Sequence, residues 1–410
     1  MSFEVQPYLL HNQIQHYAWG TQGTEAFIPY FLGLPVKENT PYAELWMGAH
    51  PKASSSIQLT SKRITLNAWV NQHSQAILGK QVAADFENTW PFLFKILSIA
   101  TPLSIQAHPN KTQAQALHAR DPKHYPDANH KPEIAIALSE LTALVGFKDF
   151  ADIVTTLTTY PEIADFIGDE IVAGVLQTNG NPSTQCESVR QLWTTLMQRA
   201  EADKAALTQT ITHLTTRLTA FPTPSEHERL FLNARQIYTG ADIGLLALFF
   251  LNLIHLKRGQ GIFLKPGIPH AYVKGNIIEC MANSDNVVRV GLTPKFKDVT
   301  TLIDILTYEL GAPPILGESD TEAVTTYSVP APEFQVQRWQ LNAGDQQTYI
   351  RPETPAIWLI IEGKIEIGWG TNSVTFSRGQ SILLPATLQN IELIALQDVE
   401  IFIANVPVKN

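Results

Sequence analysis

A short motif that occurs twice constrains the fold of this chain more than any other feature of its sequence. The first copy, at 259–266, is Gly-Gln-Gly-Ile-Phe-Leu-Lys-Pro, and the second, at 379–385, is Gly-Gln-Ser-Ile-Leu-Leu-Pro. Each copy begins with a turn, continues as a short apolar strand and ends at a proline. Before the second copy, 357–361 and 364–367 have the pattern of two strands joined by a tight turn at Glu362-Gly363. Unless two ordinary hairpins coincide by chance, the repeat predicts two double-sheet β-barrels in tandem.

The two copies differ in the residues on their C-terminal side. The first leads through a rigid turn into His270-Ala271-Tyr272, whereas residues 386–390 after the second contain no histidine, acid or cysteine. The first barrel can therefore hold a metal ion at this position, and the second is expected to be a degenerate copy. The predicted fold is mainly β, with tandem cupin (jelly-roll) β-barrels and an added α-helical domain.

The helical domain is expected where the spacing of apolar residues changes. Between residues 151 and 255 two sets have the spacing of one helix face, namely Val189, Leu192 and Leu196, and Leu207, Ile211, Leu214 and Leu218. A further helix is expected after Pro224-Ser225, with Glu226 and Glu228 in its first turn. We therefore expect a catalytic barrel built from 1–150 and 256–325, a helical insert at 151–255 and a degenerate barrel at 326–410.

Composition excludes several classes of partner. The 410 residues are 44% hydrophobic and 16% charged, with a net charge of −9, so a general attraction to nucleic acid or anionic lipid is not expected. Two distant cysteines, Cys186 and Cys280, form no disulfide framework. No signal peptide is visible, and the longest apolar stretch, 243–254, is too short to span a bilayer. We expect a cytoplasmic monomer that does not associate with membranes.

Metal-ligand residue types appear in three separate segments. In Pro-Leu-Ser-Ile-Gln-Ala-His-Pro, at 102–109, a strand would project Ser104, Gln106 and His108 from one face. The run Tyr-Pro-Asp-Ala-Asn-His-Lys-Pro-Glu, at 125–133, precedes an apolar strand, and such polar groups are costly there unless they are used or paired. A solvated loop entering a strand is the alternative for this run.

The third segment begins at His270, which the preceding Pro-Gly-Ile-Pro turn can direct into a barrel mouth. Glu279, Asp285, Arg289 and Lys295 come after it within a stretch otherwise rich in valine, isoleucine and leucine. Their density indicates a lined pocket, with a surface ladder of ion pairs as the alternative. Two imidazoles, an amide oxygen and a carboxylate, from His108, His270, Gln106 and Glu133, suit Zn²⁺, although Fe²⁺, Mn²⁺ or Co²⁺ also accept such ligands.

Five segments resemble the type I mannose-6-phosphate isomerases. They are Tyr-Ala-Trp-Gly at 17–20, Tyr-Ala-Glu-Leu-Trp-Met-Gly-Ala-His-Pro at 42–51, and the runs at 102–109, 125–133 and 270–295, in the order of that family. The resemblance implies one Zn²⁺ per chain, held by Gln106, His108, Glu133 and His270. It implies a sugar phosphate as substrate and Arg289 as a catalytic residue. The residues it implies as pocket lining are Lys131, Glu279, Tyr272 and Lys295, and Ser104 and Lys95 are further candidates for substrate contact.

An aldose–ketose isomerase moves a proton between two adjacent carbons through an enediol, so it needs a base, an electrophile and a grip on the phosphate. The residues that could serve as base are Glu279, Asp285, His130 and Lys131. We favour Glu279, with Lys131 second, and assign Asp285 and His130 to substrate binding. Six cations in or beside the motifs suit an anionic substrate, namely Lys95, Lys111, Lys131, Arg289, Lys295 and Lys297.

Two other functions compete with this interpretation. A different metal-dependent cupin, such as an iron oxygenase or a sugar epimerase, would use a related scaffold. Gln106 as a fourth ligand argues against the oxygenase, which usually has two histidines and one carboxylate. A non-catalytic double cupin that stores a sugar would explain the barrels but not the charged cluster at Glu279, Asp285, Arg289 and Lys295.

Overall fold

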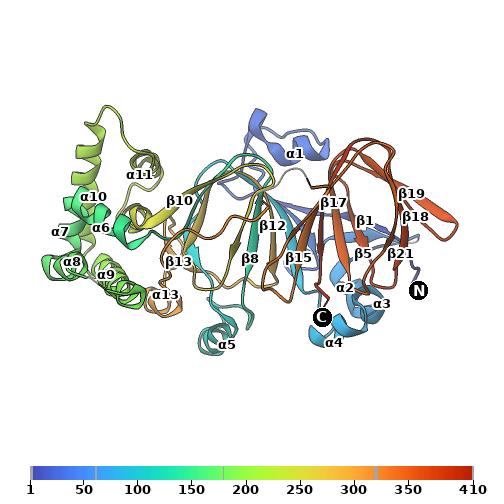
Figure 1. The fold of residues 1–410 in the computed structure, drawn as a ribbon, viewed down its shortest axis with the longest axis horizontal. Coiled ribbons are helices and arrows are strands. Elements are labelled where there is room, and N and C mark those ends of the chain that lie inside the picture. The colour runs from blue at the N-terminus through green and yellow to red at the C-terminus, as the bar shows by residue number, and fades with distance from the viewer. Residues whose placement is uncertain (1–2, 61, 179, 318–321, 409–410) are drawn as a thin grey trace.

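The computed structural model describes residues 3–60, 62–178, 180–317 and 322–408. A helical lobe lies at one end of the molecule. A first β region lies in the middle, and a second β region lies at the other end (Figure 1). Helix and strand each account for 31% of the chain. The fold is therefore less strongly β than the sequence predicted, because short helices occur in residues 1–150 as well as in the helical lobe.

The middle region is a ten-stranded antiparallel sheet, and its strands carry the candidate site. The path runs β10-β9-β12-β6-β3-β2, with β7, β8, β11 and β13 paired beside it. The strands are β2 (Gln13–Gln15), β3 (Glu44–Gly48), β6 (Phe92–Ile99), β7 (Ile105–Ala107), β8 (Glu133–Ala137), β9 (Leu141–Phe147), β10 (Leu251–Leu256), β11 (Gly261–Leu264), β12 (His270–Ala282) and β13 (Val288–Gly291). The long strand β12 pairs with β6, β7, β8 and β9, so it links the whole region.

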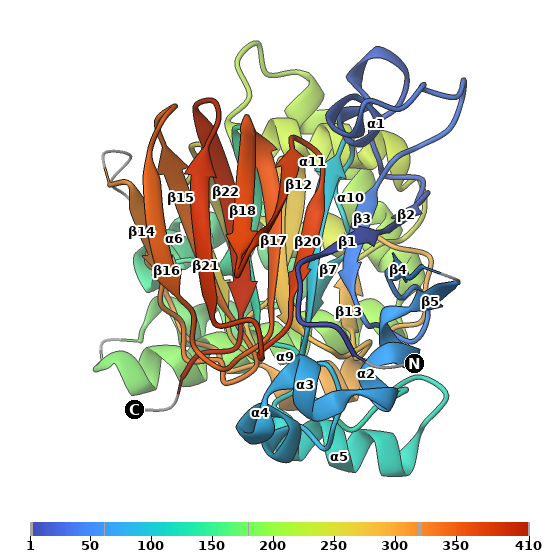
Figure 2. The ribbon, with the colours of Figure 1, turned by 90° about the vertical axis from the view of Figure 1, so that its right-hand side faces the viewer.

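The second β region consists of an eight-stranded and a four-stranded antiparallel sheet (Figure 2). The larger has the order β14 (Val324–Tyr327), β15 (Gln335–Leu341), β22 (Val399–Asn405), β17 (Ala356–Glu362), β20 (Ser381–Leu384), β1 (Tyr8–His11), β4 (Ser56–Gln58) and β5 (Arg63–Thr65). The smaller has the order β16 (Gln346–Ile350), β21 (Asn390–Ala395), β18 (Lys364–Trp369) and β19 (Asn372–Ser377). Both motif copies form the predicted strands, β11 and β20.

The two strands predicted on either side of Gly363 form, but they do not make a hairpin. β17 pairs with β20 and β22, whereas β18 pairs with β19 and β21 in the other sheet. Gly363 has φ 79°, and a Cβ there would lie 2.1 Å from the carbonyl oxygen of Asp398. Only glycine fits this position, where the chain crosses from one sheet to the other.

The first strand of the chain also departs from the expected layout. β1 pairs with β20, with Tyr8 opposite Leu383, so residues 1–150 contribute to both β regions. Tyr8 and Leu10 are buried in the core that the two regions share. Burial of this apolar face explains why β1 joins a sheet whose other strands come from the C-terminal end.

The helical lobe confirms the predicted apolar stripes. Its helices are α6 (Phe150–Thr159), α7 (Pro161–Ile167), α8 (Asp169–Leu176), α9 (Pro182–Ala202), α10 (Lys204–Thr219), α11 (Glu226–Ile237), α12 (Gly244–Ala247) and the 3₁₀ turn η2 (Leu248–Phe250). Both predicted stripes are buried in one core, on α9 and α10. Ser225 and Glu228 form a capping box that begins α11. Strand β10 lies inside the segment 151–255 but pairs with β9, so the helices end at residue 250.

The remaining helices cover the β regions. They are the 3₁₀ turn η1 (Gly23–Glu25), α1 (Phe27–Leu32), α2 (Leu66–Gln72), α3 (Ser74–Leu78), α4 (Lys80–Asp85), α5 (Lys111–Arg120) and α13 (Val299–Ile305). In Figure 1 helices α2 to α5 lie along one edge of the two β regions, and α1 lies at the opposite edge. Over the described ranges, no helix has the length and apolar character needed to cross a bilayer.

Strand alternation separates a shared core from the candidate site. On β6, Phe92, Phe94 and Ile96 face the core that the two β regions share. Lys95, between them, points to the other face, as expected for a strand. Glu133 on β8 likewise lies opposite in direction to Ile134, which belongs to the shared core. Burial of the apolar side chains of each strand thus determines that the polar side chains between them point to the other face.

Candidate metal centre and surrounding pocket

Four strands that pair in the middle sheet carry the first group of predicted residues. His270, at the start of β12, lies opposite Gln106 of β7 in the ladder. Gln106 in turn lies opposite Arg289 of β13. Glu133 begins β8, on the other side of β12, where it pairs with Met281. Residues from four separate segments of the sequence are therefore carried by strands that pair with one another.

His108, Glu133 and His270 form a buried cluster that has the character of a metal site. One ligand atom from each lies within 4.8 Å of the other two. The Oε2 atom of Glu133 is 3.6 Å from Nε2 of His108 and 3.4 Å from Nε2 of His270. Each side chain is at most 2% exposed, and none of these three atoms has a hydrogen-bond partner among the residues that the structure describes. Buried polar atoms without a partner are costly, and a shared divalent cation would satisfy all three at once.

The other nitrogen of each imidazole is held by backbone. His108 Nδ1 lies 2.8 Å from the carbonyl oxygen of Asn286, and His270 Nδ1 lies 2.9 Å from that of Ile268. A protonated Nδ1 donates to these oxygens, which leaves the lone pair of Nε2 directed at Glu133. This is the arrangement in which histidine binds metal in proteins.

The sequence did not single out the residues that support His108. The side-chain amide of Asn286 donates to the backbone carbonyls of Asp127 (2.7 Å) and Asn129 (2.9 Å). The Asp127 carboxylate accepts the backbone N–H of Asp285 at 2.7 Å and the hydroxyl of Ser284 at 2.8 Å. The run at 125–133 therefore supplies both a ligand, Glu133, and the anchor for a second one. The high proportion of polar residues in the run at 125–133 was the sequence feature that could have indicated this support.

Electrostatics keep the cluster in a form suited to cations. Burial, together with the charge of Lys131, lowers the pKa of His108 to about 4, so its imidazole is neutral at physiological pH. Burial raises the pKa of Glu133, but the charge of Lys131, followed by the interactions with the His108 and His270 side chains, outweighs burial and holds that pKa well below its usual range. Lys131 Nζ lies 2.7 Å from Oε1 of Glu133. A neutral imidazole and an ionised carboxylate are the protonation states that metal binding requires.

A bulge in β12 places Glu279 on the same face as His270 and Tyr272. The register with β9 shifts between Tyr272 and Lys274, which inserts one extra residue. His270 and Glu279 are an odd number of residues apart, so without the bulge they would face opposite sides. With it, Glu279 shares the inner face, while its neighbours Ile278 and Cys280 lie in the shared core.

Glu279 is the centre of a second buried charged group. Lys95 Nζ lies 2.6 Å from Oε2 of Glu279 and 3.7 Å from Oε2 of Glu44. Burial, partly offset by Lys95 and reinforced by Glu133, raises the pKa of Glu279. Burial and the nearby negative charge of Glu279 raise the pKa of Tyr272. Glu44 was missed as a candidate, although it lies in the run at 42–51.

Arg289 is unusual because its guanidinium is half-buried and forms no ion pair or hydrogen bond with any described residue. Burial lowers its pKa. Lys295 is exposed, and partial desolvation, with the charge of Arg289 next, lowers its pKa as well. Two adjacent cations without partners suit an anionic ligand. Ser104 is half-buried near this end of β7 and makes no side-chain hydrogen bond within the described part of the chain.

Asp285 and His130 are engaged by other partners. Asp285 Oδ2 lies 2.8 Å from Lys52 Nζ and 3.6 Å from His50 Nε2. These three residues line a hollow of about 700 Å³ whose lining includes none of the four predicted ligands. His130 Nε2 lies 2.6 Å from Oε1 of the buried Glu333. The structure therefore separates both side chains from the cluster, unlike Lys131 and Glu279.

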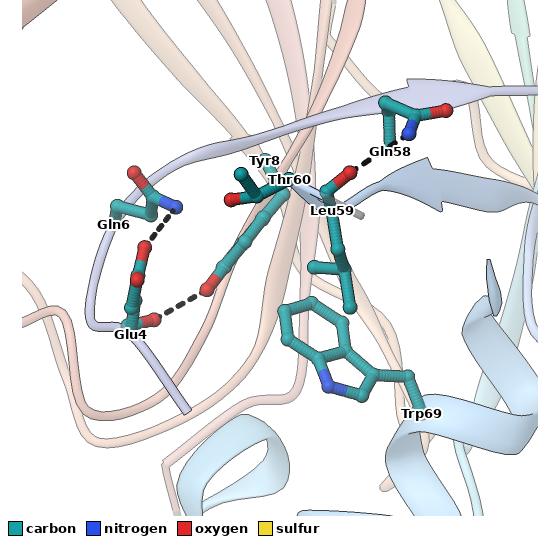
Figure 3. Close-up of a pocket in the computed structure, with 7 residues that line it drawn as sticks. All are labelled: Glu4, Gln6, Tyr8, Gln58, Leu59, Thr60 and Trp69. Carbon is teal, nitrogen blue, oxygen red and sulfur yellow. Dashed lines mark hydrogen bonds between the residues drawn. The ribbon is translucent and has the colours of Figure 1, made fainter. Parts of the chain in front are cut away.

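A second hollow, of about 340 Å³, lies at the N-terminal edge of the second β region (Figure 3). Its polar groups bond to one another: the hydroxyl of Tyr8 donates to the backbone of Glu4, and Gln6 donates to the Glu4 carboxylate at 3.2 Å. Gln58 donates to the carbonyl of Leu59 at 2.7 Å. None of the predicted site residues lines this hollow, and its mutually bonded groups leave little for a ligand to bind.

Comparison with known proteins identifies the family. Residues 8–150 match the model of the catalytic domain of type I phosphomannose isomerase. The chain is 37% identical over 393 residues to mannose-6-phosphate isomerase 2 of Arabidopsis thaliana, covering 92% of this chain and 88% of that protein. It is 37% identical over 372 residues to the mannose-6-phosphate isomerase of Homo sapiens, covering 86% of each. The chain belongs to the type I mannose-6-phosphate isomerase family.

Solved structures of this isomerase family share the fold along nearly the whole chain. A variant of the phosphomannose isomerase from Salmonella typhimurium superposes with a TM-score of 0.85 at 28% identity, covering 98% of this chain and 100% of that one. A zinc-bound mannose 6-phosphate isomerase superposes equally well, with a TM-score of 0.85, 28% identity and the same coverage. The helical lobe and both β regions are thus common to this isomerase family.

The anchoring of His108 predicts a role for Asn286 in metal binding. Asn286→Ala removes the amide that fixes the loop carrying its carbonyl, so the His108 ring loses its fixed orientation. Loss of such outer contacts typically costs about 10–100-fold in metal affinity. Titration of Zn²⁺ against a chromophoric chelator measures the change. Asn405→Ala, in β22 of the other region, is the matched control, and equal affinity in both variants would contradict the prediction.

Proposed function

We propose that this protein interconverts mannose 6-phosphate and fructose 6-phosphate with the help of one bound Zn²⁺. The observation that carries the proposal is the buried cluster of His108, Glu133 and His270, whose ligand atoms lack hydrogen-bond partners among the described residues. Arg289 lies nearby in the ladder, opposite the predicted ligand Gln106. Relatives 37% identical to the chain over most of its length bear the name of this activity. The proposal thus rests on the chemistry of the site and on the family together.

The proposed metal ligands are Gln106, His108, Glu133 and His270. The three partnerless atoms provide two nitrogens and one oxygen, and Gln106 lies directly opposite His270 in the ladder. When bound, Zn²⁺ supplies a Lewis acid that polarises the oxygens of the sugar. Glu133 is the single anionic ligand, and Lys131 at 2.7 Å compensates part of its charge. The site as a whole therefore keeps its positive character toward an anionic substrate.

We assign Arg289 to stabilising the negative charge that develops on oxygen during the reaction. A half-buried guanidinium that forms no ion pair with the described residues remains available to a developing oxyanion, and partial desolvation strengthens that interaction. In the Salmonella typhimurium enzyme, alanine variants were made at a glutamate and an arginine with the same spacing as Glu279 and Arg289. Alanine variants of the same enzyme were also made at a lysine and a histidine that are as far apart in sequence as Lys95 and His108 are here. These choices support the same residues here.

We assign Glu279 as the base that carries the proton between C2 and C1. Its carboxylate takes the C2 proton of the aldose, and the resulting enediolate becomes an enediol as O1 gains a proton. The O2 hydroxyl then loses its proton, and the proton held by Glu279 passes to C1 to give the ketose. Burial raises its pKa, which brings the carboxylate nearer to the basicity that proton transfer near neutral pH requires. The competing base, Lys131, is occupied by the proposed ligand Glu133. Lys95, at 2.6 Å from Glu279, keeps the carboxylate in place.

The phosphate is assigned to the cations at the edge of the site. Lys295 is exposed and adjacent to Arg289, so it can reach a substrate group that remains near solvent. Tyr272 and Ser104 offer hydroxyls for the sugar. Asp285 and His130 remain predicted substrate contacts, although Lys52 and Glu333 occupy them in the free protein. The substrate would have to compete with those partners.

The scaffold is proposed to be two cupin barrels with a helical insert. The middle region, from 1–150 and 256–325, would be the metal-binding barrel, and 326–410 the degenerate one, with β1, β4 and β5 added from the N-terminal half. The alternation of apolar and polar faces on β6 and β8 supports a barrel with a lined interior. A monomeric state and a cytoplasmic location stay predictions.

The reaction itself is the first test. The purified protein should convert mannose 6-phosphate to fructose 6-phosphate in a coupled assay, lose activity on chelation and regain it with Zn²⁺. Adding Mg²⁺ instead of Zn²⁺ is the control for ionic strength. A folded, zinc-loaded sample without turnover, but with bound sugar phosphate, would establish the non-catalytic cupin function in place of the isomerase.

Arg289→Ala should separate catalysis from metal binding. Removal of one such electrostatic donor typically lowers kcat by about 10²–10³. Because Arg289 contacts no proposed ligand atom, the zinc content should stay at one per chain. Arg258→Ala, which removes an arginine in the turn before β11, should keep full activity. Parallel loss of zinc and activity in Arg289→Ala would make Arg289 a structural residue instead.

The pH profile tests Glu279 as base. A base acts in its deprotonated form, so kcat/KM should rise with pH through the pKa of Glu279. Because burial raises that pKa, the acid limb should lie above the pH range of an ordinary glutamate, about 4.3. Glu279→Gln should lower kcat by about 10²–10⁴ and remove the limb. A limb that persists in the residual activity of Glu279→Gln would move the role to Lys131.

A further inference from the structure

The helical insert is connected to the cations of the site by one buried carboxylate. Asp242, between α11 and α12, is 7% exposed. Its Oδ1 atom accepts the backbone N–H groups of Gly244 and Leu292, both at 2.8 Å, and its Oδ2 atom accepts that of Thr293 at 3.0 Å. Two of these three donors belong to the segment directly after β13, about fifty residues away in the sequence.

The segment that Asp242 holds needs such support. β13 pairs only with β7 among the described strands, so its other edge lacks a strand neighbour. Leu292 has φ 55°, a left-handed conformation that is sterically unfavourable for a leucine. A residue persists in this region only when surrounding contacts fix it. The carboxylate of Asp242 provides the contact, because it accepts the N–H groups of Leu292 and of the next residue in the chain.

The backbone at Gly244 and the backbone at Gly291 and Leu292 are in close contact. A Cβ on Gly244 would lie 2.4 Å from the backbone nitrogen of Leu292, and a Cβ on Gly291 would lie 2.3 Å from the backbone nitrogen of Gly244. Glycine at both positions lets the two backbones touch. The apolar side chains of Ile243, Leu245 and Leu292 pack in one core on the same side. The start of α12 and the end of β13 therefore form one rigid junction.

This junction lies between the two cations assigned to the substrate. Arg289 precedes it on β13, opposite Gln106. On its other side, the hydroxyl oxygen of Thr293 accepts the backbone N–H of Lys295 at 3.1 Å. Lys297 Nζ donates to the carbonyl of Thr293 at 3.1 Å and lies 3.9 Å from Oδ2 of Asp242. We call residues 289–297 the cationic arm.

We propose that Asp242 is a positioning residue for the isomerase reaction: it fixes the cationic arm so that Arg289 and Lys295 meet the sugar phosphate at the correct distance. The helical insert, through Asp242, is thereby part of the substrate-binding apparatus and not only a cover for the barrel. This inference rests on the proposed function of Arg289 and Lys295. It predicts that a change in the insert, outside contact with substrate or metal, alters catalysis.

Asp242→Asn tests the proposal. The amide has one acceptor oxygen, so its NH₂ group must face one of the three backbone donors, and the arm shifts. Misplacement of about 1 Å can cost on the order of 10²-fold in rate. We expect kcat/KM for mannose 6-phosphate to fall about ten- to hundred-fold, with weaker inhibition by inorganic phosphate. Zinc content should remain at the wild-type value, since no proposed ligand lies on the arm.

Glu228→Gln is the matched control for loss of stability. Glu228 is also a buried carboxylate of the helical lobe, 7% exposed, and it lies 3.2 Å from the hydroxyl of Tyr160. Its replacement should lower the melting temperature but leave kcat, KM and phosphate inhibition unchanged, because it does not contact the arm. All kinetics are measured well below the melting temperatures of both variants.

Gly244→Ala tests the same junction without removing a charge. If Asp242→Asn does not fold, the kinetics of Gly244→Ala test the proposal in its place. The added methyl group presses on the Leu292 backbone, so the kinetic pattern of Asp242→Asn should recur. Gly174→Ala, in α8 where an added Cβ meets nothing within 4 Å, is its control. Wild-type kinetics in the junction variants, or equal losses in junction and control variants, would overturn the inference and leave the isomerase intact. An inactive wild-type protein would instead overturn the proposed function.

Discussion

The carboxylate of Glu133 is the group on which the rest of the site depends. It is 1% exposed, within 3.6 Å of two imidazole nitrogens, and balanced by Lys131 on its other oxygen. An isolated buried carboxylate would be protonated or would destabilise the fold. Here the lysine keeps it ionised, and the backbone carbonyls behind both histidines keep their lone pairs directed at it. A cation completes this arrangement, which is why the orphaned atoms indicate a metal site and not a structural ion pair.

Strand β12 places further polar side chains on the same face as this cluster. It carries His270, Tyr272 and Glu279, and the bulge between Tyr272 and Lys274 places all three on one face. Its opposite face contributes Ile278 and Cys280 to the core shared with the second β region. The C-terminal sheets therefore support catalysis indirectly, because burial of their apolar faces fixes the direction in which the catalytic strands present their charges.

An acidic protein that binds an anion must gather its cations locally. The net charge is −9, yet Arg289 and Lys295 lie close to each other, and neither forms an ion pair with a described residue. Lys95 and Lys131 are different, since each is paired with a buried glutamate and serves to set its charge. We propose that Arg289 and Lys295 meet the substrate, whereas Lys95 and Lys131 set the charge of the glutamates beside them. We propose that the helical insert contributes to substrate binding through Asp242, which fixes the cationic arm that bears Arg289 and Lys295.

The sequence alone determined the elements and the donor types. Period-two alternation predicted that Gln106 and His108 project from one face, helical spacing identified the stripes of α9 and α10, and the motif runs indicated the predicted ligands. These features are local, so a few neighbouring residues suffice to reveal them. Only the tertiary structure decided that β17 and β18 belong to different sheets, that β1 joins the C-terminal sheet, that Asn286 holds His108, and that Asp242 holds the cationic arm. Each of these depends on a backbone group meeting a residue far away in the chain, and a backbone N–H or carbonyl is the same in every residue, so the sequence carries no local mark of its partner.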